Sequence, residues 1–126
     1  MEDMLDKTNL QSLLEENHWL KPYLNQKKII FKQDTVNGYQ IHFSDDEIEI
    51  IYSSISQRNR AILSLTTTKH DETETSVVKD LGVMVDCSRN AVPKISTLKK
   101  FIRYLSFMGY TFLGLYMEDT LKIDGE

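Results

Sequence analysis

Two clusters of charged residues in the last third of the chain could bind a polar ligand. Asp86 and Arg89 follow one apolar segment. Glu118 and Asp119 follow the next. Carboxylates accept hydrogen bonds from ligand hydroxyl groups, and arginine presents five donors in a planar fork. If the two segments are neighbouring parallel strands, both clusters leave the sheet at one edge, which is where α/β folds bind ligands. These four residues are therefore the candidate substrate-binding residues.

Each cluster also has a purely structural interpretation. Asp86 can cap the loop that it begins, with Arg89 as its ion-pair partner. Glu118 and Asp119 can form a solvated turn. The sequence leaves both interpretations open, and the two clusters together support a ligand-facing edge more strongly than either cluster does alone. Cys87, the single cysteine, is expected to be a packing residue rather than a nucleophile.

The elements that must position these clusters are predicted to be a strand, a helix and a second strand. An apolar run at 83–85 predicts the first strand, and an apolar run at 110–116 predicts the second. A helix from about Pro93 to Met108 carries one apolar stripe and is followed by Gly109, which suits a helix end. Uninterrupted apolar strands are typical of parallel sheets. We therefore predict a βαβ unit with a right-handed crossover.

One βαβ unit leaves much of its apolar surface without a partner. Two parallel strands and a single helix cannot cover both faces of a sheet. We therefore expect the 126 residues to be the N-terminal part of a longer protein. We also expect the chain to self-associate through residues 82–116, because unpaired strand edges accept another strand.

The first part of the chain is predicted to contain an antiparallel sheet. Asn37-Gly38 is a strong turn signal, and apolar residues alternate with polar ones after it. The pattern predicts an antiparallel meander. Its strands are expected at 28–32, 39–43 and 48–52.

Helices at 8–17 and 55–67 are expected to accompany this sheet, the second packing on it, which makes the fold class α+β. The polar segment 69–76 carries no core residue and is predicted to be a domain boundary or a surface loop. The two predicted domains are an α+β N-terminal domain at 1–75 and the βαβ unit at 76–126.

Composition and charge exclude several classes of partner. The net charge is −4 and there is no basic stripe, which argues against nucleic acid. No apolar run reaches the roughly 20 residues of a membrane span, and the acidic N-terminus does not resemble a secretory signal. The three histidines have no metal-ligand spacing, so no metal or cofactor is predicted. We expect a cytoplasmic protein.

Two aromatic residues near Pro22 have alternative interpretations. The rings of Trp19 and Tyr23 could stack on a sugar. They could instead pack against the first helix and fix its position. The packing interpretation is the favoured one.

The last third of the chain resembles the first barrel segment of glycoside hydrolase family 20. The resemblance rests on Gly-Val-Met-Val-Asp-Cys-Ser-Arg-Asn at 82–90, a following helix, and Leu-Tyr-Met-Glu-Asp-Thr at 115–120. It is similar to the bacterial, cytosolic branch of the family. The resemblance implies a β-N-acetylhexosaminidase, with an α+β domain before a (β/α)8 TIM barrel that is truncated here.

The resemblance also implies a mechanism and a substrate. The family removes terminal N-acetylhexosamine from glycans by substrate-assisted hydrolysis, with an Asp-Glu pair at a later barrel strand. By position, that pair is not among these residues, so no catalytic residue is assigned and the 126 residues alone are expected to be inactive. Two adjacent Asp-Glu pairs fall in the first domain and are rejected for this role. They are Asp46-Glu47 and Asp71-Glu72.

One position departs from the family pattern. Many members carry an arginine just before the glycine of the first strand, where it grips sugar hydroxyls, but this chain has Leu81. Sugar recognition would then fall to other residues, such as Arg89 and Glu118. The alternative to the enzyme is a non-catalytic α+β interaction module whose βαβ unit docks on a protein partner.

Overall fold

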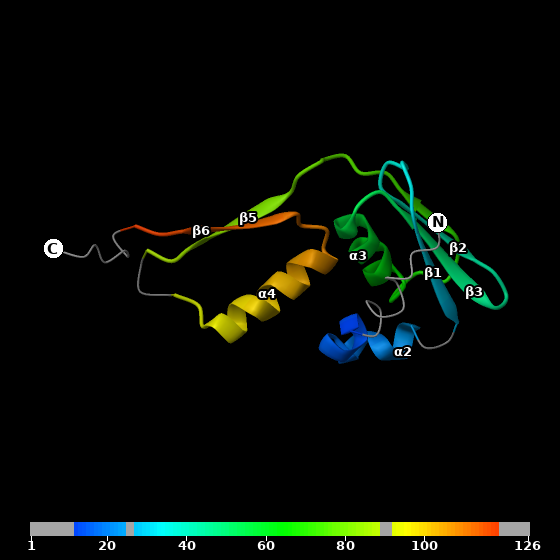
Figure 1. Ribbon diagram of the computed structural model, residues 1–126, viewed down its shortest axis with the longest axis horizontal. Coiled ribbons are helices and arrows are strands. Elements are labelled where there is room, and N and C mark those ends of the chain that lie inside the picture. Colours follow the sequence, from blue (N-terminus) through cyan, green and yellow to red (C-terminus); the bar gives the residue numbers. More distant parts are fainter. Residues whose placement is uncertain (1–11, 25–26, 89–91, 119–126) are drawn as a thin grey trace.

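The structure is a computed structural model that describes residues 12–24, 27–88 and 92–118. It is a mixed α+β fold with two separate sheets (Figure 1). Residues 12–16 are helical, which confirms this part of the predicted first helix, whose predicted start lies outside the described residues. The elements that follow are η1 (His18–Leu20), α2 (Lys21–Leu24), β1 (Lys28–Gln33), β2 (Tyr39–Phe43), β3 (Glu47–Tyr52), α3 (Ile55–Ser64), β4 (Glu72–Glu74), β5 (Gly82–Asp86), α4 (Ile95–Phe107) and β6 (Phe112–Tyr116).

The first sheet has four strands in the order β1-β3-β2-β4. β2 and β3 are antiparallel, as predicted, but β1 pairs with β3 in parallel, with Lys28 opposite Glu47. The predicted antiparallel meander is therefore wrong at its first strand. β3 suits the central position because it carries apolar residues on both faces. Ile50 is fully buried on one face, and Ile51 is half-buried on the other.

The glycine of the Asn37-Gly38 turn has a role other than closing a hairpin. Gly38 has a φ of 107°, a conformation that favours glycine. A Cβ at this position would lie 2.0 Å from the backbone oxygen of Glu74. The glycine therefore allows β4 to approach closely, and the chain enters β2 without folding back on β1.

The polar segment 69–76 contributes a strand, so the prediction of a surface loop is wrong at Glu72–Glu74. β4 pairs with β2 in antiparallel fashion, with Tyr39 opposite Glu74 and Ile41 opposite Glu72. Pattern analysis misses this strand because its side chains are polar. They hydrogen-bond to the Tyr39 hydroxyl and to the end of α3 instead of entering the apolar core.

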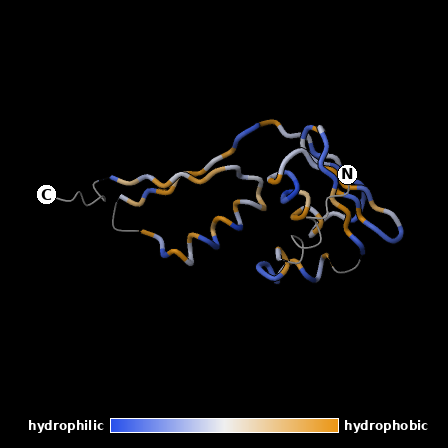
Figure 2. Tube along the Cα trace, viewed as in Figure 1, coloured by the Kyte–Doolittle hydropathy of each residue, from blue (hydrophilic) through white to orange (hydrophobic). Residues whose placement is uncertain are grey.

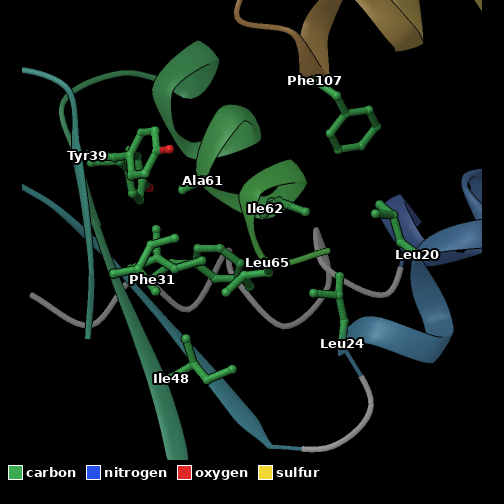
Figure 3. Packing of buried hydrophobic residues seen from close by; sticks show 12 residues of the cluster. Leu20, Leu24, Phe31, Tyr39, Ile48, Ala61, Ile62, Leu65 and Phe107 are labelled. Carbon is green, nitrogen blue, oxygen red and sulfur yellow. The ribbon is translucent and has the colours of Figure 1, made fainter. Parts of the chain in front are cut away.

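A single apolar core lies between the first sheet and α3 (Figure 3). The Ser54 side chain caps α3 by accepting a backbone N–H of the first turn, and the helix ends at Ser64. The predicted helix at 55–67 is thus confirmed except for its last turn. Phe107 of α4 reaches the same core beside α3 and Leu20, so the second part of the chain takes part in the packing of the first. The buried core residues are Leu20, Leu24, Phe31, Tyr39, Ile41, Ile48, Ile50, Tyr52, Ala61, Ile62, Leu65 and Phe107.

The second sheet is a strand pair that extends away from the first (Figure 1). β5 and β6 are parallel, with Val83 opposite Leu113, and α4 connects them, which confirms the predicted strand–helix–strand unit. α4 begins at Ile95, two residues after Pro93. Gly109 follows the helix with a φ of 86°, as expected of a residue just past a helix end.

One face of the β5–β6 pair is apolar and exposed, although uninterrupted apolar strands are usually covered on both faces. The register places Met84, Phe112 and Tyr116 on this face, with 69%, 58% and 46% of their surface exposed. The Phe112 ring covers Gly82, and Met84 lies against Gly114. Apolar residues recur along both strands (Figure 2). Below, Met84, Phe112 and Tyr116 are called the outer face.

Candidate functional site

The parallel pairing brings the ends of β5 and β6 to one edge, as the sequence predicts. Asp86 is the last residue of β5 and lies opposite Tyr116, the last residue of β6. The backbone N–H of Cys87 donates to the Tyr116 oxygen at 2.7 Å, which holds the two strand ends together. Glu118 follows two residues after β6 and is exposed. Asp86 and Glu118 therefore both leave the strand pair at this edge.

The other two candidate residues, Arg89 and Asp119, lie outside the described residues. The ligand-binding assignment of all four residues stays a prediction. Cys87 is 7% exposed, and its Sγ lies 3.9 Å from the backbone oxygen of Val85, which suits the packing role expected of it.

The Asp86 side chain stabilises the start of the loop that follows β5. Its Oδ1 accepts the backbone N–H of Ser88 at 2.8 Å and also a short hydrogen bond from the Ser88 hydroxyl. The hydroxyl, followed by the backbone N–H, lowers the pKa of Asp86, so the carboxylate is charged at neutral pH. Both of these contacts use Oδ1, and Asp86 is an exposed residue. The loop-capping interpretation therefore holds, and the second oxygen can still accept a hydrogen bond from a ligand.

A second polar cluster, which the sequence did not predict, lies between β2, β4 and the end of α3. The Tyr39 hydroxyl donates to Glu72 Oε1 at 2.6 Å and lies 3.1 Å from Glu74 Oε2. The Ser64 hydroxyl donates to Glu72 Oε1 at 2.6 Å, and the Thr68 hydroxyl donates to Glu72 Oε2 at 2.7 Å. Glu72 thus accepts three hydroxyl hydrogen bonds and joins two strands to one helix.

The pKa shifts in this cluster indicate a structural role for its residues rather than a role in acid–base catalysis. Burial raises the pKa of Tyr39, and its hydrogen bond to Glu72 raises that pKa further, so the phenol stays protonated. Burial opposes ionisation of Glu72, but the hydrogen bonds from Ser64, Tyr39 and Thr68 outweigh it and lower the pKa of that carboxyl. Neither group is poised to exchange a proton near pH 7. A hollow of about 640 Å³ adjoins the cluster, and Arg60, Thr67 and Thr73 also line it. We call it the polar hollow.

The cluster makes a pH-dependent contribution to stability. Because the pKa of Glu72 is lowered on folding, its contribution is present above the ordinary value of 4.5 and is lost as the pH falls through the folded-state pKa. We expect Glu72→Gln to lower the free energy of unfolding by about 1–2 kcal/mol at pH 7, because the amide nitrogen cannot accept the Thr68 hydroxyl. The difference should shrink between pH 7 and pH 3, because the contribution of the charged carboxylate declines as the pH falls below 4.5. Urea unfolding at the two pH values measures both differences.

A matched control for this prediction lies in the β2–β3 turn, where Asp45 is an exposed carboxylate. Asp45→Asn should change stability by less than about 0.5 kcal/mol at either pH. An equal loss from Glu72→Gln at pH 3 and pH 7 would show that the charged form of Glu72 contributes nothing.

The described part of the chain offers neither a metal-binding cluster nor a membrane-spanning helix. It holds no group of three or more His, Cys, Asp or Glu residues placed to bind a metal ion. His42 instead lies 3.4 Å from Asp71, which also accepts the backbone N–H of Phe43 at 2.8 Å. No helix within the same residues has the length and apolar character needed to cross a membrane.

Comparison with known proteins leaves the family open. A scan against protein-family models and a search of curated proteins found no match to this chain. The resemblance to glycoside hydrolase family 20 therefore rests on the residues at 82–90 and 115–120 alone.

Proposed function

We propose that this chain is the N-terminal part of a β-N-acetylhexosaminidase of glycoside hydrolase family 20, with β5, α4 and β6 as the first βαβ unit of its (β/α)8 barrel. The observation that carries the proposal is the parallel pairing of β5 with β6, which sends Asp86 and Glu118 to one edge. Barrels of this class build their active sites at the carboxyl ends of their strands.

The outer face supports the proposal. In a (β/α)8 barrel, helices cover one face of each strand, and the other face points into an interior packed with side chains from several strands. Met84 and Phe112 are large, apolar and exposed on one face of the pair. On the opposite face, Val83, Val85 and Leu113 are half-buried, and Leu115 is 39% exposed. An exposed apolar face of this kind is expected of a barrel segment that is not covered by the other strands of the barrel.

In the proposed enzyme, Asp86 and Glu118 bind the sugar. Each carboxylate would accept hydrogen bonds from hydroxyl groups of a terminal N-acetylhexosamine, with Arg89 and Asp119 following in the same two loops. The acetamido oxygen of the substrate would attack the anomeric carbon, and an Asp-Glu pair at a later barrel strand would orient that group and transfer the proton. The 126 residues alone would then bind part of the sugar but not cleave it.

The test compares this chain with the complete product of its gene on 4-nitrophenyl N-acetyl-β-D-glucosaminide and its galacto epimer. Hydrolysis by the complete protein and none by the 126 residues is the expected result. In the complete protein, Asp86→Asn and Glu118→Gln should each lower kcat/KM by about 10–100-fold, the effect of losing one hydrogen bond to a charged group. Asp80→Asn is the matched control, because Asp80 is an exposed carboxylate at the opposite end of β5.

Two outcomes would contradict the proposal. Turnover by the 126 residues alone would place the catalytic groups among them. A gene product without further βα repeats and a later Asp-Glu pair would favour the non-catalytic interaction module instead.

A further inference from the structure

β4 is an edge strand without a large apolar side chain. It consists of Glu72, Thr73 and Glu74 and pairs with β2, as the last strand of the first sheet. Burial of apolar surface, the main stabilising contribution for most strands, therefore adds little to its attachment. The backbone hydrogen bonds to β2 and the polar side chains of the segment hold β4 in place.

Three carboxylates attach this segment to the rest of the fold, each at a different point. Asp71 accepts the backbone N–H of Phe43 at 2.8 Å, at the end of β2. Glu72 accepts three hydroxyl hydrogen bonds, and Glu74 forms a short ion pair with Arg60 of α3. Hydrogen bonds to an ionised acceptor are roughly twice as strong as neutral ones, so the attachment depends on the negative charge of these three groups. Asp71, Glu72 and Glu74 are called the three carboxylates below.

The charged groups that contact the three carboxylates are basic. Arg60 pairs with one of them, and His42 of β2 lies 3.4 Å from another. His70 comes directly before the segment, with its Nδ1 3.0 Å from the backbone oxygen of the next residue. Beyond His42, Glu49 lies opposite it in β3 and forms a short ion pair with Lys32 of β1. Protonation of the three carboxylates would therefore leave basic side chains beside β4 without a counter-charge.

Both carboxyls with a shifted pKa attach the segment more strongly at neutral pH than in acid. The backbone N–H of Phe43, followed by the His42 side chain, lowers the pKa of Asp71. Burial opposes ionisation of Glu72, but its hydrogen bonds outweigh burial and lower its pKa. Detachment would return the two groups to their ordinary values of 3.8 and 4.5, so it takes up protons and becomes more favourable as the pH falls below these values. Tyr39 stays protonated throughout, because burial raises its pKa.

We propose that residues 71–74 form an acid-sensitive latch: at neutral pH the three carboxylates hold β4 on the edge of β2, and in acid the segment detaches while the rest of the sheet stays folded. The apolar core does not depend on the latch, because no residue of 71–74 belongs to it. Detachment removes the partners of Tyr39, Gln40 and Ile41 in β4 and so uncovers a strand edge that can accept another strand. The inference does not rest on the proposed hydrolase activity.

Hydrogen–deuterium exchange followed by mass spectrometry tests the latch in the unsubstituted chain. Protection factors, corrected for the intrinsic pH dependence of exchange, are compared between β4 and β3 at pH 7 and pH 3. Protection of β4 should fall by about 10–100-fold, the effect of weakening several hydrogen bonds to charged groups. Protection of β3, which has a strand on either side, should change by less than about threefold.

Neutral variants should reproduce the detached state without acid. In the triple variant Asp71→Asn, Glu72→Gln, Glu74→Gln, protection of β4 at pH 7 should be about 10–100-fold lower than in the unsubstituted chain. A lower pH should then have little further effect. Glu47→Gln is the matched control, because Glu47 is also a strand carboxylate in an ion pair, with Lys28 as its partner. It should leave the protection of β4 unchanged, and the protection of β3 shows whether each variant is folded.

Three results would overturn the proposal. The first is protection of β4 that stays the same at pH 7 and pH 3. The second is protection of β4 and β3 that falls together over the same pH range, which would assign the acid effect to global unfolding. The third is a folded triple variant in which β4 is as protected at pH 7 as in the unsubstituted chain.

Discussion

Replacing Phe107 with alanine will lower the free energy of unfolding by about 3–5 kcal/mol, a large share of the stability of a domain this size. The ring is 3% exposed, lies in the core between α3 and Leu20, and meets Trp19 edge-on at 5.7 Å. Its removal leaves a cavity that the surrounding helices cannot close fully. The measurement is urea unfolding followed by circular dichroism.

The matched control is Phe112→Ala. Phe112 has the same side chain but is 58% exposed, so its loss should cost less than about 1 kcal/mol. Similar losses for the two variants would show that Phe107 does not join α4 to the first core. A second readout is Trp19 fluorescence, which Phe107→Ala should shift and Phe112→Ala should leave unchanged.

The 126 residues on their own will self-associate through the outer face, with a mass in light scattering that rises with concentration above that of one chain. Met84, Phe112 and Tyr116 form an apolar surface of a kind that soluble monomers rarely leave exposed. The strand pair also has two outer edges, and within the described residues neither is paired with a third strand. Phe112→Lys places a charge on this surface and should weaken association by about tenfold or more.

Ile55→Lys is the matched control, because Ile55 is 55% exposed but lies at the start of α3, in the first part of the chain. It should leave association unchanged. A monodisperse monomer for the unsubstituted chain at high concentration would contradict the prediction. In the proposed enzyme, further barrel strands would cover the outer face, so the complete protein should not associate in this way.

Sequence patterns identified most elements because apolar periodicity is a local property. Alternation in Tyr39-Gln40-Ile41 predicted β2, and the apolar stripe of α4 predicted that helix. The pairing of β1 could not be predicted in the same way, since a strand of apolar residues can lie parallel or antiparallel to its neighbour. The Asn37-Gly38 turn signal led to a wrong pairing of β1 with β2. The positive φ of Gly38 instead allows the backbone of β4 to approach closely.

Of the two candidate sites, the sequence predicted one and missed the other. Asp86 and Glu118 could be placed at one edge from the order of elements alone, because parallel strands end together. The cluster around Glu72 could not, since it forms only when β4 pairs with β2 and brings Glu72 to Tyr39, which is distant in sequence. A weak signal existed: a tyrosine on a predicted inward-facing position needs a partner for its hydroxyl.

The strand order of the first sheet determines where that sheet can grow. Its two edges are β1 and β4. β1 carries Lys28 and Lys32, which pair with Glu47 and Glu49 of the neighbouring strand, and β4 is only three residues long. Charged and short edge strands are poor templates for an incoming strand. Lateral growth of this sheet is therefore disfavoured, and among the described strands β5 and β6 are the better templates for an incoming strand.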